Sequence, residues 1–407
     1  MLEFEAWWLL AIPLFFGLGW FASRYDSRLS SGDRRRDAGL PDAYFRGLNF
    51  LLNEQPDKAI DAFIDVVKLD PETVDLHFAL GNLFRRRGET DRAIRVHLNL
   101  AERSDLDAGQ REHALFELGQ DYLKAGLLDR AEDAFNRLEG TRYAAAALHH
   151  RLEIAQMVRD WPLAVELAQR LQRDLKEGRA TEIAHFHCEL AAQGLAGASA
   201  ARFETARREL DAAREVAPAH PRPWLLRGEA AAAEGDDLAA IAAWREVERE
   251  SPQFMALAAP GWLAAHQRLG RLDEGIAALE AIQGAHPSID TFSALAAART
   301  ERDGPAQALA WAEQALRAAP SLLGLQQLLA IRVSLLDAMP ATAAAPLEST
   351  RAEVELTQRL IQAQARRLSR YVCSHCGFKA RQFYWQCPGC NRWDTYAPKR
   401  SEELERG

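Results

Sequence analysis

The chain has 407 residues, a formal net charge of −8, and hydrophobic side chains at 48% of its positions. This length allows two or three domains. Alanine and leucine dominate and β-branched runs are scarce, which is typical of helical proteins. The mild acidity argues against a protein whose whole surface binds nucleic acid.

The N-terminal segment differs from the rest in composition. Residues 6–22 read AWWLLAIPLFFGLGWFA and carry no charge. As a helix with a rise of about 1.5 Å per residue, this stretch would be roughly 26 Å long, close to the lower limit for crossing a bilayer. A cleaved signal peptide is the main alternative, but Glu3 and Glu5 stand where such a peptide carries basic residues. We therefore predict a transmembrane anchor over residues 1–23.

The charges around this segment predict its orientation. Arg24, Arg28 and the run 34–36 follow it, and no basic residue precedes it. Basic residues flanking a membrane helix favour the cytoplasmic side. We expect residues 24–39 to form a basic juxtamembrane linker, able to contact anionic head groups, and the body of the protein to be cytoplasmic.

A repeat of about 34 residues occupies residues 40–338. Successive gaps between Pro218, Pro252, Pro287 and Pro320 are 34, 35 and 33 residues. Such a period, with small residues at fixed offsets, resembles the tetratricopeptide repeat, a helical hairpin. One hairpin cannot bury its own apolar face, so we expect about eight units to stack into a superhelix. In the unit after residue 145, Leu152 stands at the small-residue position, which makes close packing there less certain.

Recurrent residues in the repeat have structural roles. Large side chains at consensus positions should fill the core rather than bind ligands, namely Phe63, Phe84, Phe135 and Trp244. Glycines at Gly88, Gly126, Gly235 and Gly270 should form the turns between paired helices. Binding in such arrays takes place on the concave groove, whose contact residues we do not assign from the sequence.

Two Cys-x-x-Cys pairs stand near the C-terminus. Cys373, Cys376, Cys387 and Cys390 have the spacing of a tetrahedral four-sulfur site. They predict one bound ion, either iron or zinc, since both metals accept four thiolates. A saturated site is more often structural than catalytic. Gly377 suits a tight knuckle, and we expect His375, between two ligands, to be exposed.

Other motifs favour structural interpretations. His185, His187 and Cys188 resemble a metal cluster, but residues two apart on a helix face different directions, so a structural role is expected. No phosphate-binding loop, nucleophile elbow or paired-histidine protease motif is found in the sequence. We predict no catalytic residues, no organic cofactor site and no enzymatic activity.

Residues 339–370 should form a linker and a helix. We expect a loop over residues 339–350, a cap at Thr350 with Glu353 three positions later, and a helix to about Arg367. The metal module should cover residues 371–397, followed by a tail, 398–407. The module is basic, so it should dock on the acidic repeats or face lipid phosphates or an acidic partner.

This combination of parts resembles the lipopolysaccharide assembly protein B (LapB) family of Gram-negative bacteria, over essentially the whole chain. The two knuckles, 373–378 and 387–390, are similar to that family's rubredoxin-like domain. Asn391 stands where rubredoxin usually has glycine. The fold class that follows is all-α: a tetratricopeptide superhelix with an N-terminal transmembrane helix and a small C-terminal rubredoxin-like module.

The resemblance implies a function. Members are non-catalytic adaptors in the inner membrane, with the N-terminus in the periplasm. They promote degradation of the committed-step deacetylase LpxC by the membrane protease FtsH, which limits lipopolysaccharide synthesis, and a periplasm-facing regulator relieves this effect. Expected partners are therefore these proteins and inner-membrane lipid, with a homodimer possible and no nucleic acid.

Two other functions stay open at this point. A rubredoxin-like electron-transfer protein on a helical scaffold would use an iron ion that cycles between oxidation states. A nucleic-acid binder would use the aromatic, basic ribbon containing Phe383, Tyr384, Trp385 and Trp393.

Overall fold

The computed structural model describes residues 45–337 and 344–405, apart from positions 48, 51, 52, 54, 70–72 and 200. The chain divides into two compact units, Met1–Arg159 and Asp160–Gly407. The boundary falls within the repeat in which Leu152 replaces a small residue. Helices of the first unit are α3 (Pro56–Leu69), α4 (Val74–Arg87), α5 (Thr90–Glu102), α6 (Ala108–Lys124), α7 (Leu128–Asn136) and α8 (Ala144–Val158).

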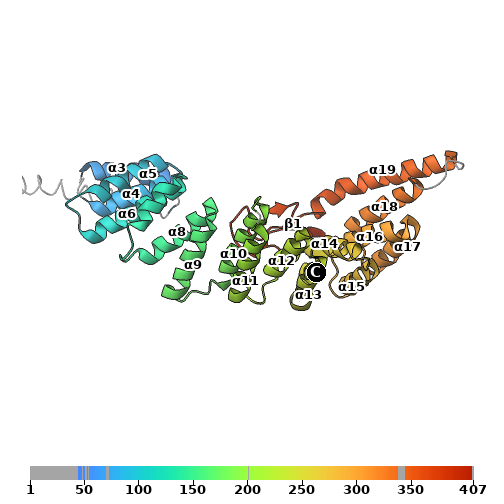
Figure 1. Ribbon diagram of the computed structural model, residues 1–407. Helices are drawn as coiled ribbons and strands as arrows, with labels where there is room; N and C mark the ends of the chain where they lie inside the picture. The colour runs from blue at the N-terminus through green and yellow to red at the C-terminus, as the bar shows by residue number, and fades with distance from the viewer. Residues whose placement is uncertain are drawn as a thin grey trace, which may run out of the picture. The chain divides into compact units, whose positions relative to one another are not determined.

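The second unit combines a longer helical array with the cysteine module (Figure 1). Its helices are α9 (Trp161–Leu175), α10 (Ala180–Ala196), α11 (Arg202–Val216), α12 (Pro221–Glu234), α13 (Asp237–Glu250), the 3-10 turn η1 (Pro252–Phe254), α14 (Met255–Arg268), α15 (Leu272–Ala285), α16 (Ile289–Asp303), α17 (Pro305–Ala318), α18 (Leu322–Asp337), α19 (Ala344–Leu368) and α20 (Ser401–Leu404). The strands β1 (Tyr371–Val372) and β2 (Lys379–Ala380) pair antiparallel, with Tyr371 opposite Ala380.

Proline and glycine punctuate the helices as the repeat predicts. The helices α11, α13, α15 and α17 each end two residues before a proline, at Val216, Glu250, Ala285 and Ala318. Proline disfavours the helical conformation in the residue before it, so the helix stops there. The four predicted turn glycines all have positive φ, between 69° and 90°. These observations confirm the helical-hairpin pattern.

A glycine on the first helix of a pair faces a ring on the second helix, sixteen positions later. In the first unit the pairs are Gly47 with Phe63 and Gly119 with Phe135, and in the second unit Gly228 with Trp244. A methyl group built on any of these glycines would lie within 2.7 Å of the ring. Phe63, Phe84, Phe135 and Trp244 are at most 3% exposed, which confirms them as core residues.

One hairpin of the first unit has a histidine at the position where the hairpins named above have phenylalanine or tryptophan. His97 lies against Gly81 and is fully buried. Its Nδ1 is 2.5 Å from a carboxylate oxygen of Asp121, and Arg85 donates to the other oxygen at 2.9 Å. Arg85 also pairs with Glu117 at 2.5 Å. The next repeat thus supplies a buried carboxylate for one ring nitrogen, Nδ1, whereas Nε2 has no hydrogen-bond partner among the described residues.

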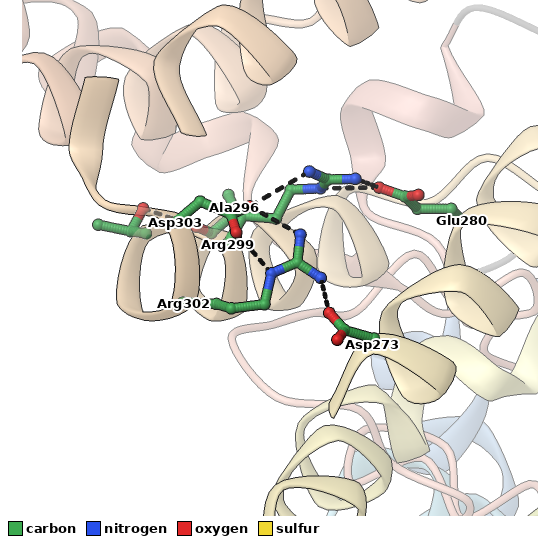
Figure 2. A network of polar contacts seen from close by, with 7 residues as sticks. Asp273, Glu280, Ala296, Arg299, Arg302 and Asp303 are labelled. Atoms are coloured by element: carbon green, nitrogen blue, oxygen red, sulfur yellow. Dashed lines mark hydrogen bonds and ion pairs between the residues drawn. The ribbon is translucent and has the colours of Figure 1, made fainter. Parts of the chain in front are cut away.

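In the second unit, ion pairs connect the pair α15 and α16 (Figure 2). Arg302 of α16 reaches Asp273 of α15 at 2.5 Å. Arg299, one turn earlier, donates from Nε to Glu280 at 2.7 Å. Asp273 and Arg302 are partly exposed, so each pair adds little to stability and mainly fixes helix orientation.

The first helices of successive pairs form a continuous layer in the second unit. The helices α10 and α12 contact each other, as do α12 and α14, α14 and α16, and α16 and α18. In a helical-repeat superhelix the more closely packed layer lies on the inner, concave side. We call this surface the first-helix layer.

Two expectations about the chain ends have different outcomes. The helix α19 begins at Ala344 rather than after a cap at Thr350, so the expected loop over 339–350 is wrong for its second half. Pro346 does not prevent this, because a proline in the first turn lacks only an N–H that has no helical partner there. The expected anchor, residues 1–23, lies outside the described residues. Among the described helices, none combines the length and apolar character needed to span a membrane.

The glycine–ring contact gives a stability prediction. Gly228→Ala should reduce the free energy of unfolding by about 1–3 kcal/mol, because its methyl group would lie 2.2 Å from Nε1 of the buried Trp244. Gly284→Ala on α15 is the matched control, since nothing lies within 4 Å of the added methyl group. It should be neutral or stabilising by up to about 1 kcal/mol. Chemical denaturation measures both, and equal destabilisation would contradict the packing argument.

Candidate metal centre and its docking site

The four predicted thiols converge in the C-terminal module. Their sulfur atoms all lie within 4.8 Å of one another. The Cys373 and Cys390 sulfurs are 3.8 Å apart, and the Cys376 and Cys387 sulfurs 3.7 Å apart. Around a tetrahedral ion with metal–sulfur bonds of about 2.3 Å, neighbouring sulfurs would be about 3.8 Å apart. The four side chains could therefore hold one metal ion, and iron and zinc both suit such a site.

Two equivalent knuckles position these thiols. In the first, the Gly377 N–H donates to the Cys373 carbonyl at 3.0 Å, and in the second the Asn391 N–H donates to the Cys387 carbonyl at 2.8 Å. Both turn residues have positive φ, 74° for Gly377 and 55° for Asn391. Asparagine is one of the few other residues that adopt this conformation readily. The substitution of glycine by Asn391 thus leaves the knuckle intact.

Backbone donors surround the sulfur atoms. The N–H of Cys376 points at the Cys373 sulfur at 3.5 Å, and that of Gly389 at the Cys387 sulfur at 3.4 Å. Hydrogen bonds to the charged form of a group favour that form. For Cys373 the effect of burial is outweighed by such donors, which lower the pKa of the thiol to about 6 and so favour the thiolate, the form that binds a metal. His375 between two of the thiols is exposed, as expected.

A carboxylate just after the second knuckle attaches the module to the helical array. Asp394 accepts from Nε2 of His185 on α10 at 2.9 Å and lies 3.4 Å from Nε2 of His220, the residue before α12. His185 is fully buried. Figure 1 shows that the module, although distant in sequence, lies beside α10, α12 and α14.

Arg222 determines which ring nitrogen of His185 carries the proton. Its Nη1 is 3.0 Å from Nδ1 of His185, and its Nη2 donates to Glu189 at 2.5 Å. A guanidinium can only donate, so Nδ1 of His185 is the acceptor and the proton is on Nε2, facing Asp394. Burial lowers the pKa of His185 to about 4, despite the opposing effect of Asp394. The imidazole is therefore neutral at physiological pH.

The same geometry opposes a second metal site. Ligand atoms of His185, His220 and Asp394 lie within 4.8 Å of one another. A cation on Nε2 of His185 would move the ring proton to Nδ1, where it would face the N–H groups of Arg222. We therefore assign this trio to docking rather than to metal binding.

Two tryptophans of the module complete the contact. Trp393 stacks on His185 with 4.4 Å between ring centroids, and Trp385 stacks on Phe254 of η1 at 5.4 Å. The guanidinium of Arg222 lies 5.6 Å from both indole rings. Aromatic and cation–π contacts of this kind contribute roughly 0.5–1.5 kcal/mol each.

The residues after the module bind the ends of two further helices. Glu403 accepts from the N–H of Ile289 at 3.0 Å, and Glu402 accepts from those of Leu322 and Leu323 at 2.6 and 3.0 Å. These N–H groups open α16 and α18, where a helix has unpaired donors and positive partial charge. The tail thus adds carboxylate acceptors at the N-termini of two helices in the first-helix layer, beside the local caps Ser288 and Ser321.

An arginine in the same tail completes this end of the interface. Arg400 binds Asp290 of α16 from Nη2 at 2.7 Å, and the Tyr371 hydroxyl donates to Asp290 at 2.7 Å. The Arg400–Asp290 ion pair has the polarity expected of a basic C-terminal part on an acidic surface. Asp394 of the module and Glu402 and Glu403 of the tail show the opposite polarity, because these acids bind histidines and helix N-termini.

The other sequence expectations can now be compared with the structure. His187 faces away from His185 and lies 2.9 Å from Glu209. Cys188 is fully buried, and burial raises the pKa of its thiol to about 12. The structural interpretation of this cluster is therefore confirmed, although the docking role of His185 was not foreseen. Trp385 and Trp393 are occupied by the helical array, which removes the main stacking surface of a nucleic-acid binder.

Comparisons with known proteins agree with this architecture. A family model described as the rubredoxin metal binding domain matches residues 371–398, and a tetratricopeptide repeat model matches residues 46–109 and 192–253. Lipopolysaccharide assembly protein B of Escherichia coli K12 is 33% identical over 96% of this chain and 97% of its own length. The chain belongs to this family.

Two other proteins show weaker similarity to this chain. The Haemophilus influenzae lipopolysaccharide assembly protein B is 27% identical over 97% of this chain and 98% of its own. A tetratricopeptide repeat protein from Parabacteroides merdae, known from a crystal structure, is 13% identical with a TM-score of 0.33, covering 72% of this chain and 98% of that one. The family places this chain among lipopolysaccharide assembly proteins built on helical repeats.

Removing one thiol tests whether the module needs its metal ion to fold and dock. We expect the purified protein to contain about one equivalent of iron or zinc and Cys373→Ser to lose it. Because metal binding to such sites contributes roughly 10–16 kcal/mol to local folding, hydrogen exchange over residues 371–405 should then rise. Cys188→Ala, at the buried cysteine outside the cluster, should keep the metal.

Two results would contradict this structural role of the metal. In one, Cys373→Ser loses the ion but retains protection of the module. In the other, the ion is iron that cycles reversibly at an accessible potential, which would support the electron-transfer alternative instead.

Docking should weaken in acid. The undocked His185 binds a proton near its ordinary pKa of 6.5, whereas the docked residue binds one only near pH 4. Docking is therefore most stable above pH 6.5 and should lose up to about 3 kcal/mol as the pH falls from 6.5 to 4. Below this window, protonation of Asp394 adds a further loss, because the two imidazoles lower its pKa in the docked state even though burial alone would raise it.

Denaturant titrations at pH 7 and pH 5, followed by tryptophan fluorescence, measure this effect. His185→Gln should flatten the pH dependence, since glutamine can donate to Asp394 without titrating. His286→Gln, at an exposed histidine of the same unit, should behave as the unchanged protein does. The same pH dependence in all three proteins would show that other groups cause it.

Proposed function

We propose that the chain is a non-catalytic adaptor anchored in the inner membrane that limits lipopolysaccharide synthesis by promoting FtsH-dependent proteolysis of LpxC. Its family membership and its helical-repeat fold support a protein that assembles other proteins. Residues 1–23 would form the anchor, with a periplasmic N-terminus that can meet a periplasm-facing regulator. Tethering would raise the effective concentration of the array near a membrane protease.

The main support for this proposal is that the cysteine module packs against the helical array. We propose that Cys373, Cys376, Cys387 and Cys390 bind one iron or zinc ion and that this ion is structural. Four thiolates leave no open coordination position for a substrate. The faces of the module beside its second knuckle are occupied by Trp385, Trp393 and Asp394 in contact with the array. Metal binding would then shape a protein-binding surface rather than perform chemistry.

The docked module also limits where a client can bind. It contacts α10, α12 and η1 through Asp394 and the two tryptophans, and α16 and α18 through the tail. All of these contacts belong to the first-helix layer or to the turns that open it. A client protein that binds the second unit would therefore contact the part of the first-helix layer that the module leaves uncovered, or a surface that the layer and the module form together.

Client turnover tests the adaptor and the docked module together. Asp394→Ala should weaken docking of the module by about 1–3 kcal/mol without removing a thiol, because it leaves Nε2 of the buried His185 without its acceptor. We expect the LpxC half-life in Gram-negative cells to lengthen several-fold, as it should on deletion of residues 1–23. His286→Gln is the control. A normal half-life in an undocked variant, or in a variant that has lost its metal, would contradict the role assigned to the module.

Site-specific crosslinking tests the partners directly. A photoreactive amino acid in place of Gln326, half-buried on α18, should capture FtsH or LpxC in intact membranes. The same amino acid in place of Leu238, exposed on the second helix α13, is the control. Capture from both positions alike, or from neither, would oppose binding on the first-helix layer.

A further inference from the structure

A basic hollow lies between the first-helix layer and the module. It has a volume of about 620 Å³ and is open to solvent on one side. Its lining includes Ile289, Asp290, Ser293, Leu323, Gln326 and Gln327 from α16 and α18, and four arginines from the other wall: Arg366, Arg370, Arg381 and Arg400. Volumes of about 300–1,000 Å³ are usual for binding sites.

Most of the positive charge in this hollow has no acidic partner. Arg400 is neutralised by Asp290, which it binds through two nitrogen atoms. Within the part of the chain that the structure describes, no carboxylate lies within ion-pair distance of Arg366, Arg370 or Arg381. The hollow therefore carries three guanidinium groups in excess, in a protein whose overall charge is −8.

Local structure explains only one of these arginines. Arg366 is in the last turn of α19, where the helix dipole favours a cation. Arg370 and Arg381 lie beyond that helix, on either side of the strands β1 and β2. The tail brings them together with Arg366, since Ser401 binds the carbonyls of Arg367, Leu368 and Arg370, and Arg400 donates to the carbonyl of Arg381.

We propose that this hollow binds an acidic peptide segment of a partner protein. Guanidinium groups bind carboxylates through paired hydrogen bonds, and clusters of arginines are a recurrent means of recognising acidic motifs. The amides of Gln326 and Gln327 and the hydroxyl-bearing Ser293 can bond a peptide backbone, and Leu323 and Ile289 provide an apolar wall. This mixture fits a peptide lying along α16 and α18 better than a bilayer, which would need a protruding basic surface.

This inference rests on the proposed adaptor function and assigns one of its binding surfaces. Because α16 and α18 form one wall of the hollow only while the module is docked, loss of the metal should weaken peptide binding as well. In the described part of the chain, the side chains of Arg366, Arg370 and Arg381 form no hydrogen bond or ion pair. Replacing them should therefore leave metal content and tryptophan fluorescence unchanged.

Peptide binding to the full-length, metal-loaded protein in detergent tests the proposal. The probe is a fluorescein-labelled peptide with several consecutive glutamates, measured by anisotropy. The triple variant Arg366→Gln, Arg370→Gln and Arg381→Gln should bind it at least tenfold more weakly. The triple variant Arg359→Gln, Arg367→Gln and Arg392→Gln changes the net charge equally at exposed positions outside the hollow, and should bind normally.

Three results would overturn the proposal. Equal weakening in both triple variants would show that the net charge alone attracts the peptide. Equal affinity for a peptide with glutamines in place of glutamates would show that carboxylates are not recognised. Arginine-dependent binding to phosphatidylglycerol vesicles but not to the peptide would assign the hollow to a membrane surface. If deletion of residues 1–23 still lengthens the LpxC half-life in any of these cases, the adaptor function survives and only this binding surface is wrong.

Discussion

The contact between Asp394 and the two histidines of the array organises the second unit. The Asp394 carboxylate keeps part of its surface in solvent, and two imidazole N–H groups of the array donate to it, one of them from the fully buried His185. Arg222 determines which nitrogen of His185 carries the proton, so the donor always faces the module. Trp393 stacks on His185 beside this contact. Together with the tail contacts on α16 and α18, the Asp394 contact forms the two surfaces that we discuss, the covered layer and the basic hollow.

The sequence predicts the repeats and the cysteine site well because both depend on local spacing. Examples are the spacing of Gly228 and Trp244 and that of the two Cys-x-x-Cys pairs, which can be recognised in the sequence alone. His97 is an instructive exception. It occupies a ring position in the repeat but is not a typical core residue, and only the three-dimensional neighbourhood of Asp121 and Arg85 explains why it can be buried there.

Docking could not be predicted in the same way. His185 and Asp394 are separated by 209 positions, and each alone resembles an ordinary surface or core residue. The tail residues Glu402 and Glu403 read as a solvated acidic end, yet they cap α18 and α16. Such caps usually come from the residue just before a helix, so a search for local capping signals would not find them.

The attachment of the module at both ends also has a mechanical consequence. A superhelix of stacked hairpins is elastic, because small rotations at each interface add up along its length. Here one compact body is fastened to α10 at His185 and to α18 at Leu322 and Leu323. The pitch of the intervening hairpins cannot change unless one fastening opens. This part of the protein therefore behaves as a stiff frame rather than a spring, and its stiffness is set by whether the thiolate site is loaded.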